Sequence, residues 1–284
     1  GEVPLDRLSG TLIYGSRQDG NDRIFALDVE RVDEGAVTPT LLAEDAILGA
    51  PSPTTERMAF YSTRSNGQGL FGIDIGQAPT SRIIRFTRFA EDGAESPASW
   101  DARGERLVFA SRREGDRQSR IYVTWADGED DSTTIANGGD PAWHPAFESI
   151  VYSGVDQTGN RPGLWLVDSA GGNPDRLTTV ETDRRPQWSP GGQYIVFTSL
   201  ERDGNWEIYR YDTVERALTR MTDDPAQDVV PTVSPDGQLL AFLSDRNGVW
   251  AIWVMPLAGG EPVVLAPIVG DIAAWEKASI DWVP

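Results

Sequence analysis

The chain has 284 residues, no cysteine and a formal net charge of −19 at pH 7. An acidic surface of this kind repels phosphate groups, which disfavours nucleic acid and anionic membranes as partners. The lack of cysteine excludes disulfides, thiolate nucleophiles and cysteine-based zinc sites, and no apolar run reaches the roughly 18 residues of a membrane span.

Six short apolar runs, each containing an aromatic residue, recur about every 45 residues and define a repeat. They lie at residues 12–16, 58–62, 107–111, 150–154, 195–199 and 240–244, with the repeats centred near residues 14, 60, 109, 152, 197 and 242. A second run with period-two alternation follows each of them, as in IYRYD at 208–212, which indicates a second strand.

Each repeat is expected to hold four strands joined by turns. A short segment such as PQW at 186–188 precedes the two runs, and one such as RLTT at 176–179 follows them. Ser-Pro-Gly-Gly at 189–192 and Ser-Pro-Asp-Gly at 234–237 supply turn residues between strands. Four-stranded repeats of this length are typical of propeller blades. We therefore predict an all-β, six-bladed β-propeller of four-stranded antiparallel blades, in a single domain over residues 1–284.

The first repeat has no inner strand before it, and the end of the chain offers one. Ile280–Pro284 matches Pro186–Pro190 at two of five positions, including the tryptophan. We predict that this C-terminal strand completes the first blade and closes the ring, which hides two sheet edges. The alternative is that the segment is a tail.

The pattern P-x-W-S-P-[DG]-G, followed by an apolar strand, D-G or N-G and an aromatic strand, resembles the repeats of TolB-type β-propellers. The clearest copies lie at residues 186–212 and 231–255, and the resemblance covers nearly the whole chain. It is limited to the propeller, because the N-terminal α/β domain of that family is absent. The resemblance implies a bacterial, non-catalytic protein- or peptide-binding module, as an extracytoplasmic scaffold or sensor ectodomain. Any signal or anchor segment is expected to lie outside this sequence, because GEVPLDRL at the start has no apolar core.

Catalytic motifs are missing from the sequence. The single histidine, His144, stands where other repeats have the turn serine, and neither G-x-S-x-G nor H-E-x-x-H occurs. We predict no enzyme activity, no cofactor and no metal site, with a channel-bound cation such as calcium left open. Two alternatives remain: a carbohydrate-active hydrolase with channel-mouth carboxylates, and the propeller part of a peptidase.

A ligand site is expected at the channel mouth, where loops enter the inner strands. The slot five residues before the blade tryptophan holds three carboxylates and the only lysine, and other charged residues flank it. The predicted ligand-binding residues are Glu95, Asp140, Asp183, Arg184, Arg185, Asp228 and Lys277. The alternative is structural, since such acids also bond backbone amides or pair with arginines. The expected partner is a protein or peptide bound by a monomer.

Arginine recurs after the first long strand of most repeats, as in Ser62-Thr-Arg64 and Ser244-Asp-Arg246, and this recurrence favours a role in building blades. Trp206 and Trp250 follow turn glycines and are candidates either for exposed anchors or for packing against the adjacent blade.

Overall fold

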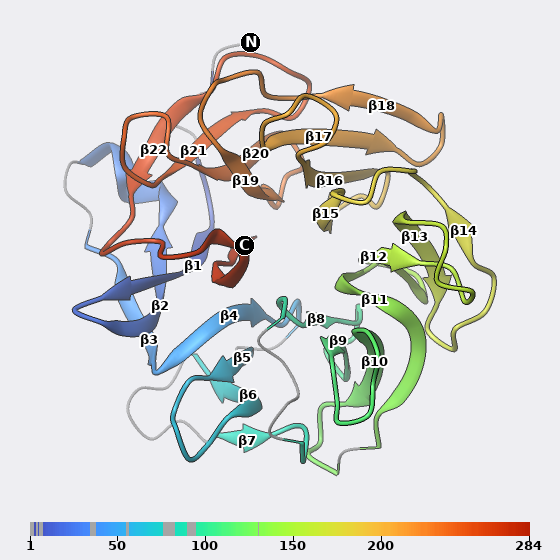
Figure 1. Ribbon diagram of the computed structural model, residues 1–284. Helices are drawn as coiled ribbons and strands as arrows, with labels where there is room; N and C mark the ends of the chain where they lie inside the picture. The colour runs from blue at the N-terminus through green and yellow to red at the C-terminus, as the bar shows by residue number, and fades with distance from the viewer. Residues whose placement is uncertain are drawn as a thin grey trace.

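Antiparallel strands surround a central axis in the computed structural model (Figure 1), which describes residues 3, 5, 8–34, 38–54, 57–75, 83–89, 95–129 and 131–284. Four sheets have four strands each. Their strands are β23 (Ile280–Val283), β1 (Thr11–Gln18), β2 (Asn21–Asp28) and β3 (Thr40–Glu44); β4 (Ala46–Pro51), β5 (Arg57–Ser62), β6 (Gly69–Asp74) and β7 (Ile84–Arg85); β15 (Arg184–Trp188), β16 (Tyr194–Ser199), β17 (Glu207–Asp212) and β18 (Ala217–Arg220); and β19 (Asp228–Val233), β20 (Leu239–Ser244), β21 (Ala251–Pro256) and β22 (Val263–Pro267).

The fifth sheet has seven strands and spans the third and fourth repeats. Its strands are β8 (Ser99–Trp100), β9 (Arg106–Ser111), β10 (Arg120–Trp125), β11 (Thr133–Trp143), β12 (Ser149–Val155), β13 (Gly163–Asp168) and β14 (Asp175–Arg176). The described ranges also contain two short 3-10 helices, η2 (Val29–Glu34) and η3 (Trp275–Lys277). None of the helices in the described part of the chain has the length and apolar character needed to cross a membrane.

The prediction of six four-stranded blades is wrong, because the described residues form four such blades and one larger sheet. The cause is β11, which runs unbroken for 11 residues and pairs with β10 through its first half and with β12 through its second half. Figure 1 shows β11 passing from one repeat to the next. The chain bends at Gly138, where φ is +156° and a Cβ atom would lie 2.3 Å from the Ser153 carbonyl oxygen. A glycine at this position therefore permits one strand to serve two repeats.

The predicted closure by the C-terminal strand is confirmed. β23 pairs antiparallel with β1, with Trp282 opposite Leu12 and Ile280 opposite Tyr14. Trp282 is buried and its Nε1–H donates to the carbonyl of Ser9 at 2.9 Å. The first blade is thus built from both ends of the described chain.

The repeated aromatic residues are cross-strand pairs within each sheet. Tyr14 stacks on Phe25 with ring centroids 5.7 Å apart, and Phe197 stacks on Tyr209 at 5.8 Å. The tryptophan of an inner strand links neighbouring repeats, since Trp188 Nε1 donates to the Ala142 carbonyl at 3.1 Å. The repeat signal in the sequence therefore records packing inside blades and contact between them.

Candidate functional site

The channel mouth gathers four of the seven predicted ligand-binding residues. A cavity of about 40 Å³ there is lined by Glu95, Asp140, Arg184 and Arg185, and by Trp275 and Glu276 of η3. The segment that carries η3, red in Figure 1, crosses the centre of the ring just before β23. The mouth of the channel is therefore covered by a turn of the chain itself.

A larger depression adjoins this cavity and shares three residues with it. It has a volume of about 420 Å³ and we call it the mouth groove; its lining residues are Glu95, Gln118, Ser119, Gly138, Gly139, Asp140, Ser153, Gly154, Val155, Glu181 and Arg184. Three glycines expose main chain along the groove, and carboxylates and one guanidinium stand around it. The groove combines backbone hydrogen-bonding groups with charged side chains, as peptide sites do.

Arg185 is buried beneath the mouth with its guanidinium incompletely paired. Only 6% of the residue is exposed, and its φ of +55° is unusual for a residue other than glycine. One Nη donates to the carbonyl of Ala278, whereas Nε and Nη1 have no hydrogen-bond partner among the described residues, and Nε lies 3.9 Å from Asp140 Oδ1. Burial lowers the pKa of this guanidinium, while Asp140 and Asp281 oppose that effect. The positive φ recurs at Leu48, Asp140 and Val230, in the same bulge of other inner strands, so it belongs to the blade. The buried and underpaired guanidinium is what distinguishes Arg185.

Asp281 lies deeper in the channel and was missed by the sequence analysis. It lines a small cavity of about 20 Å³ together with Asp140, Arg185 and Gln187. Burial raises its pKa to about 7, and the nearby Arg185 acts in the opposite direction. A signal was present in the sequence, because the residue before the blade tryptophan is Ser99, Ala142 or Gln187 in other repeats and an acid only here.

The folded protein should therefore become less stable as the pH rises, because burial disfavours the ionised form of Asp281. Because the pKa of Asp281 is raised in the folded protein, its contribution to the free energy of unfolding is fully present below about pH 4. This contribution is lost as the pH rises toward about 7. We expect Asp281→Asn to remove this part of the pH dependence in urea unfolding between pH 4.5 and 8. An unchanged slope in the variant would show that Asp281 ionises in the folded protein as it does in the unfolded chain.

Asp183 and Asp228 lie elsewhere, inside their own blades. Both are fully buried; Arg202 Nη2 lies 2.7 Å from Asp183, and Arg246 Nη2 lies 2.6 Å from Asp228. Burial raises the pKa of Asp228, and Arg246 lowers it. The same bridge recurs on the surface of the second blade, between Arg64 and Asp45 at 3.1 Å. The geometry of these two acids matches the structural alternative, because Arg202 and Arg246 each pair with the acid at their own blade entry.

Lys277 is exposed on η3 and lines a different pocket, beside Arg17. The strand register explains why. On β1, Arg17 pairs through its backbone with Asp271, and Tyr14 pairs with Ile280. Between these two pairs β1 has two residues, 15 and 16, whereas the opposite segment has eight, 272–279. The closing repeat thus carries an insertion that loops out over the channel. The prediction placed Lys277 at the position of Asp183 and Asp228 by counting five residues back from Trp282. Because the insertion adds residues to this segment, Lys277 does not occupy that position in the blade.

The remaining sequence candidates have structural surroundings. His144 is buried in a turn at the end of β11, where its Nδ1 accepts the N–H groups of Ala146 and Phe147 at 3.0 and 3.1 Å. Trp206 packs edge-on against Trp275 of η3, with centroids 4.8 Å apart. Within the described ranges, no group of three or more His, Cys, Asp and Glu side chains could hold a metal ion.

Comparison with known proteins gives a family match over part of the chain and a shared fold over nearly all of it. Residues 140–271 match the family model described as the TolB beta propeller domain. The chain is similar in fold to TolB from Acinetobacter baumannii, with a TM-score of 0.77, 17% identity and coverage of 97% of this chain and 67% of that one.

Two further solved structures share the fold. An oligogalacturonate lyase from Vibrio parahaemolyticus gives a TM-score of 0.62 at 16% identity, covering 94% of this chain and 78% of that one. A chain of a nidogen/laminin complex gives 0.68 at 10% identity, covering 96% and 98%. At these identities the likeness shows the architecture and leaves the activity to the site. Together with the family match over residues 140–271, it confirms the resemblance read from the repeats: the chain is similar to TolB-type β-propellers.

Proposed function

We propose that this chain is a non-catalytic binding module that holds an extended segment of a protein partner in the mouth groove. The observation that supports this most is the groove itself, whose glycine-lined wall presents main chain beside Glu95, Asp140 and Arg184. Its volume of about 420 Å³ lies in the range of ligand sites. An extended peptide can bond to exposed main chain while side chains at the rim select its sequence.

The charges of the groove favour a partner segment with a basic residue. Glu95, Asp140 and Glu181 line it together with a single cation, Arg184. Arg184 Nε lies 3.8 Å from Asp140 Oδ2, so part of its charge is already offset. A lysine or arginine of the partner would complement the remaining carboxylates, and the net charge of −19 would speed its approach.

Other properties of the proposal come from the family. The TolB resemblance supports a periplasmic or extracellular location, and the nidogen/laminin complex provides a propeller of this fold in a protein assembly. A scaffold or a sensor ectodomain would use the groove in the same way. Cell fractionation of the native protein tests the location, and recovery with cytoplasmic markers alone would reject it.

The binding proposal is tested with a peptide that the protein itself selects. Linear peptides chosen from a random phage library on the wild-type chain are assayed by fluorescence anisotropy against two glycine variants. Gly139→Leu places a side chain in the groove, and a Cβ at Gly139 meets no atom within 4 Å, so the fold should tolerate it. Gly191→Leu is the matched control, since its Cβ is equally unobstructed and Gly191 lies in a turn between β15 and β16, away from the groove. We expect Gly139→Leu alone to weaken binding.

A second candidate is action on an acidic sugar at the same mouth, which the fold shared with the Vibrio parahaemolyticus oligogalacturonate lyase favours. Incubation with oligogalacturonate, with and without manganese, would release unsaturated products that absorb ultraviolet light. Activity that disappears in Asp140→Asn would replace the binding proposal with this one. No product above the buffer rate would reject the candidate.

A further inference from the structure

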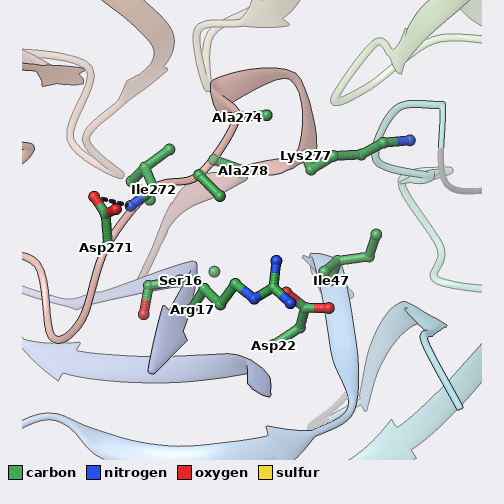
Figure 2. Close-up of a pocket in the computed structure, with 11 residues that line it drawn as sticks. Ser16, Arg17, Asp22, Ile47, Asp271, Ile272, Ala274, Lys277 and Ala278 are labelled. Atoms are coloured by element: carbon green, nitrogen blue, oxygen red, sulfur yellow. Dashed lines mark hydrogen bonds between the residues drawn. The ribbon is translucent and has the colours of Figure 1, made fainter. Parts of the chain in front are cut away.

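A second pocket lies at the ring closure and shares no lining residue with the mouth groove. It has a volume of about 330 Å³, lies between the end of β1 and the looped segment 271–278, and we call it the closure pocket. Figure 2 shows its two sides, with Ser16, Arg17 and Ile47 facing Ala274 and Ala278 of the looped segment. The pocket exists because the insertion in the closing repeat holds the chain away from β1.

The walls of the closure pocket are mainly apolar. Ile47, Ile272, Ala274 and Ala278 line it, and Ile272 is 6% exposed and packed into a core cluster. Small alanine side chains leave room that isoleucine or leucine would fill. A ligand could therefore bury an apolar group of the size of a phenyl ring here, within the usual volume of ligand pockets.

Arg17 gives the pocket a polar anchor. In the second, fifth and sixth repeats, the arginine after the first long strand pairs with the acid at its blade entry. In the first repeat, which β23 closes, the Nε–H of Arg17 donates instead to the carbonyl of Gly20 at 3.1 Å. A guanidinium has five donor hydrogens in a planar fork, so the two terminal nitrogens can take a carboxylate side by side.

The charges around the closure pocket are balanced, in contrast to the acidic chain as a whole. Arg17 and Lys277 stand with Asp22 and Asp271, and one Asp271 oxygen already accepts the N–H of Ile272 at 2.8 Å. An acidic ligand meets less repulsion here than at the mouth groove, where carboxylates outnumber the single arginine. Apolar walls beside a guanidinium suit a carboxylate attached to an apolar body.

We propose that the closure pocket binds a carboxylate that carries an aromatic or bulky aliphatic group. A peptide with an acidic residue next to an aromatic residue would present such a group. This site goes beyond the proposed function, because it is separate from the mouth groove and its test needs no protein partner. Loss of one site would leave the other intact.

The test uses 3-phenylpropionate as the probe and 3-phenylpropanamide as its uncharged match, titrated into the whole chain with isoleucine methyl groups labelled for NMR. We expect saturable shifts at Ile47 and Ile272 and about tenfold weaker binding of the amide, because a charge-assisted pair is lost. Equal binding of acid and amide, or no saturable shift at these two methyl groups, would overturn the proposal without any mutation.

Three variants locate the interaction. Arg17→Gln should abolish the preference for the acid, whereas Arg64→Gln, whose side chain is bridged to Asp45, should keep it. Ala274→Phe should block both compounds; Ala274 is exposed with an extended backbone (φ −151°), so the larger side chain should not disturb the fold. Binding that survives Ala274→Phe would place the probe elsewhere and reject the closure pocket.

Discussion

Ending the chain at Ser279 is expected to lower the free energy of unfolding by more than about 5 kcal/mol, or to prevent folding. Removing β23 takes away Ile280 and Trp282, which are 1% and 7% exposed, and leaves β1 with an open edge. Loss of a buried tryptophan alone costs about 3–5 kcal/mol, and loss of a buried isoleucine adds to it. Urea unfolding followed by tryptophan fluorescence measures the difference.

The control for this truncation is a chain that ends at Val283, which lacks only the exposed Pro284 and keeps the whole of β23. It should unfold close to the wild-type urea concentration. If the chain ending at Ser279 were as stable as this control, β23 would be a tail and the first blade would stand without it.

Replacing Arg246 with alanine is expected to cost about 3–5 kcal/mol of folding stability, because it leaves a buried carboxylate without its counterion. Asp228 is fully buried; its Oδ2 accepts from Arg246 Nη2, and its Oδ1 has no hydrogen-bond partner among the described residues. The deficit should shrink as the pH falls, since a protonated Asp228 no longer needs the cation. Thermal and urea unfolding at pH 4.5 and 8 measure the loss of folding stability and its change with pH.

Arg216→Ala is the matched control, because it removes an arginine bonded to Asp175 at 2.8 Å on the exposed surface. Its effect should be much smaller, since exposed ion pairs contribute little. If both substitutions had the same small effect, the recurring Arg–Asp bridge would be a surface contact and the account of Asp228 as a structural residue would be wrong.

Local regularities could be predicted from the sequence because each blade repeats the same packing. Tyr14, Phe197 and their strand partners occupy equivalent cross-strand positions, so the period of the repeat reveals the strands. The closing strand could be found for the same reason, since Trp282 occupies the position of Trp188. The pairing of strands from neighbouring repeats could not be predicted in this way. The unbroken β11 joins two repeats into one sheet, and no period shows whether a chain turns or continues at Gly138.

The candidate site was only partly predictable because it lies where repeats differ. Arg184 and Asp140 were found by position and do line the mouth groove. Lys277 was misplaced because the six extra residues of the looped segment shift every count made back from β23. Asp281 was overlooked because its setting, a channel interior shared with Arg185, depends on strands from distant repeats.

A partner segment that lies in the mouth groove should bind Gly139→Leu and Gly191→Leu with different affinities, and one selected peptide measures both. We predict that Gly139→Leu weakens binding by tenfold or more, about 1.4 kcal/mol, because its side chain occupies the space of the peptide. Gly191→Leu should bind as the wild type does. Equal affinities of the two variants would show that the peptide binds outside the mouth groove.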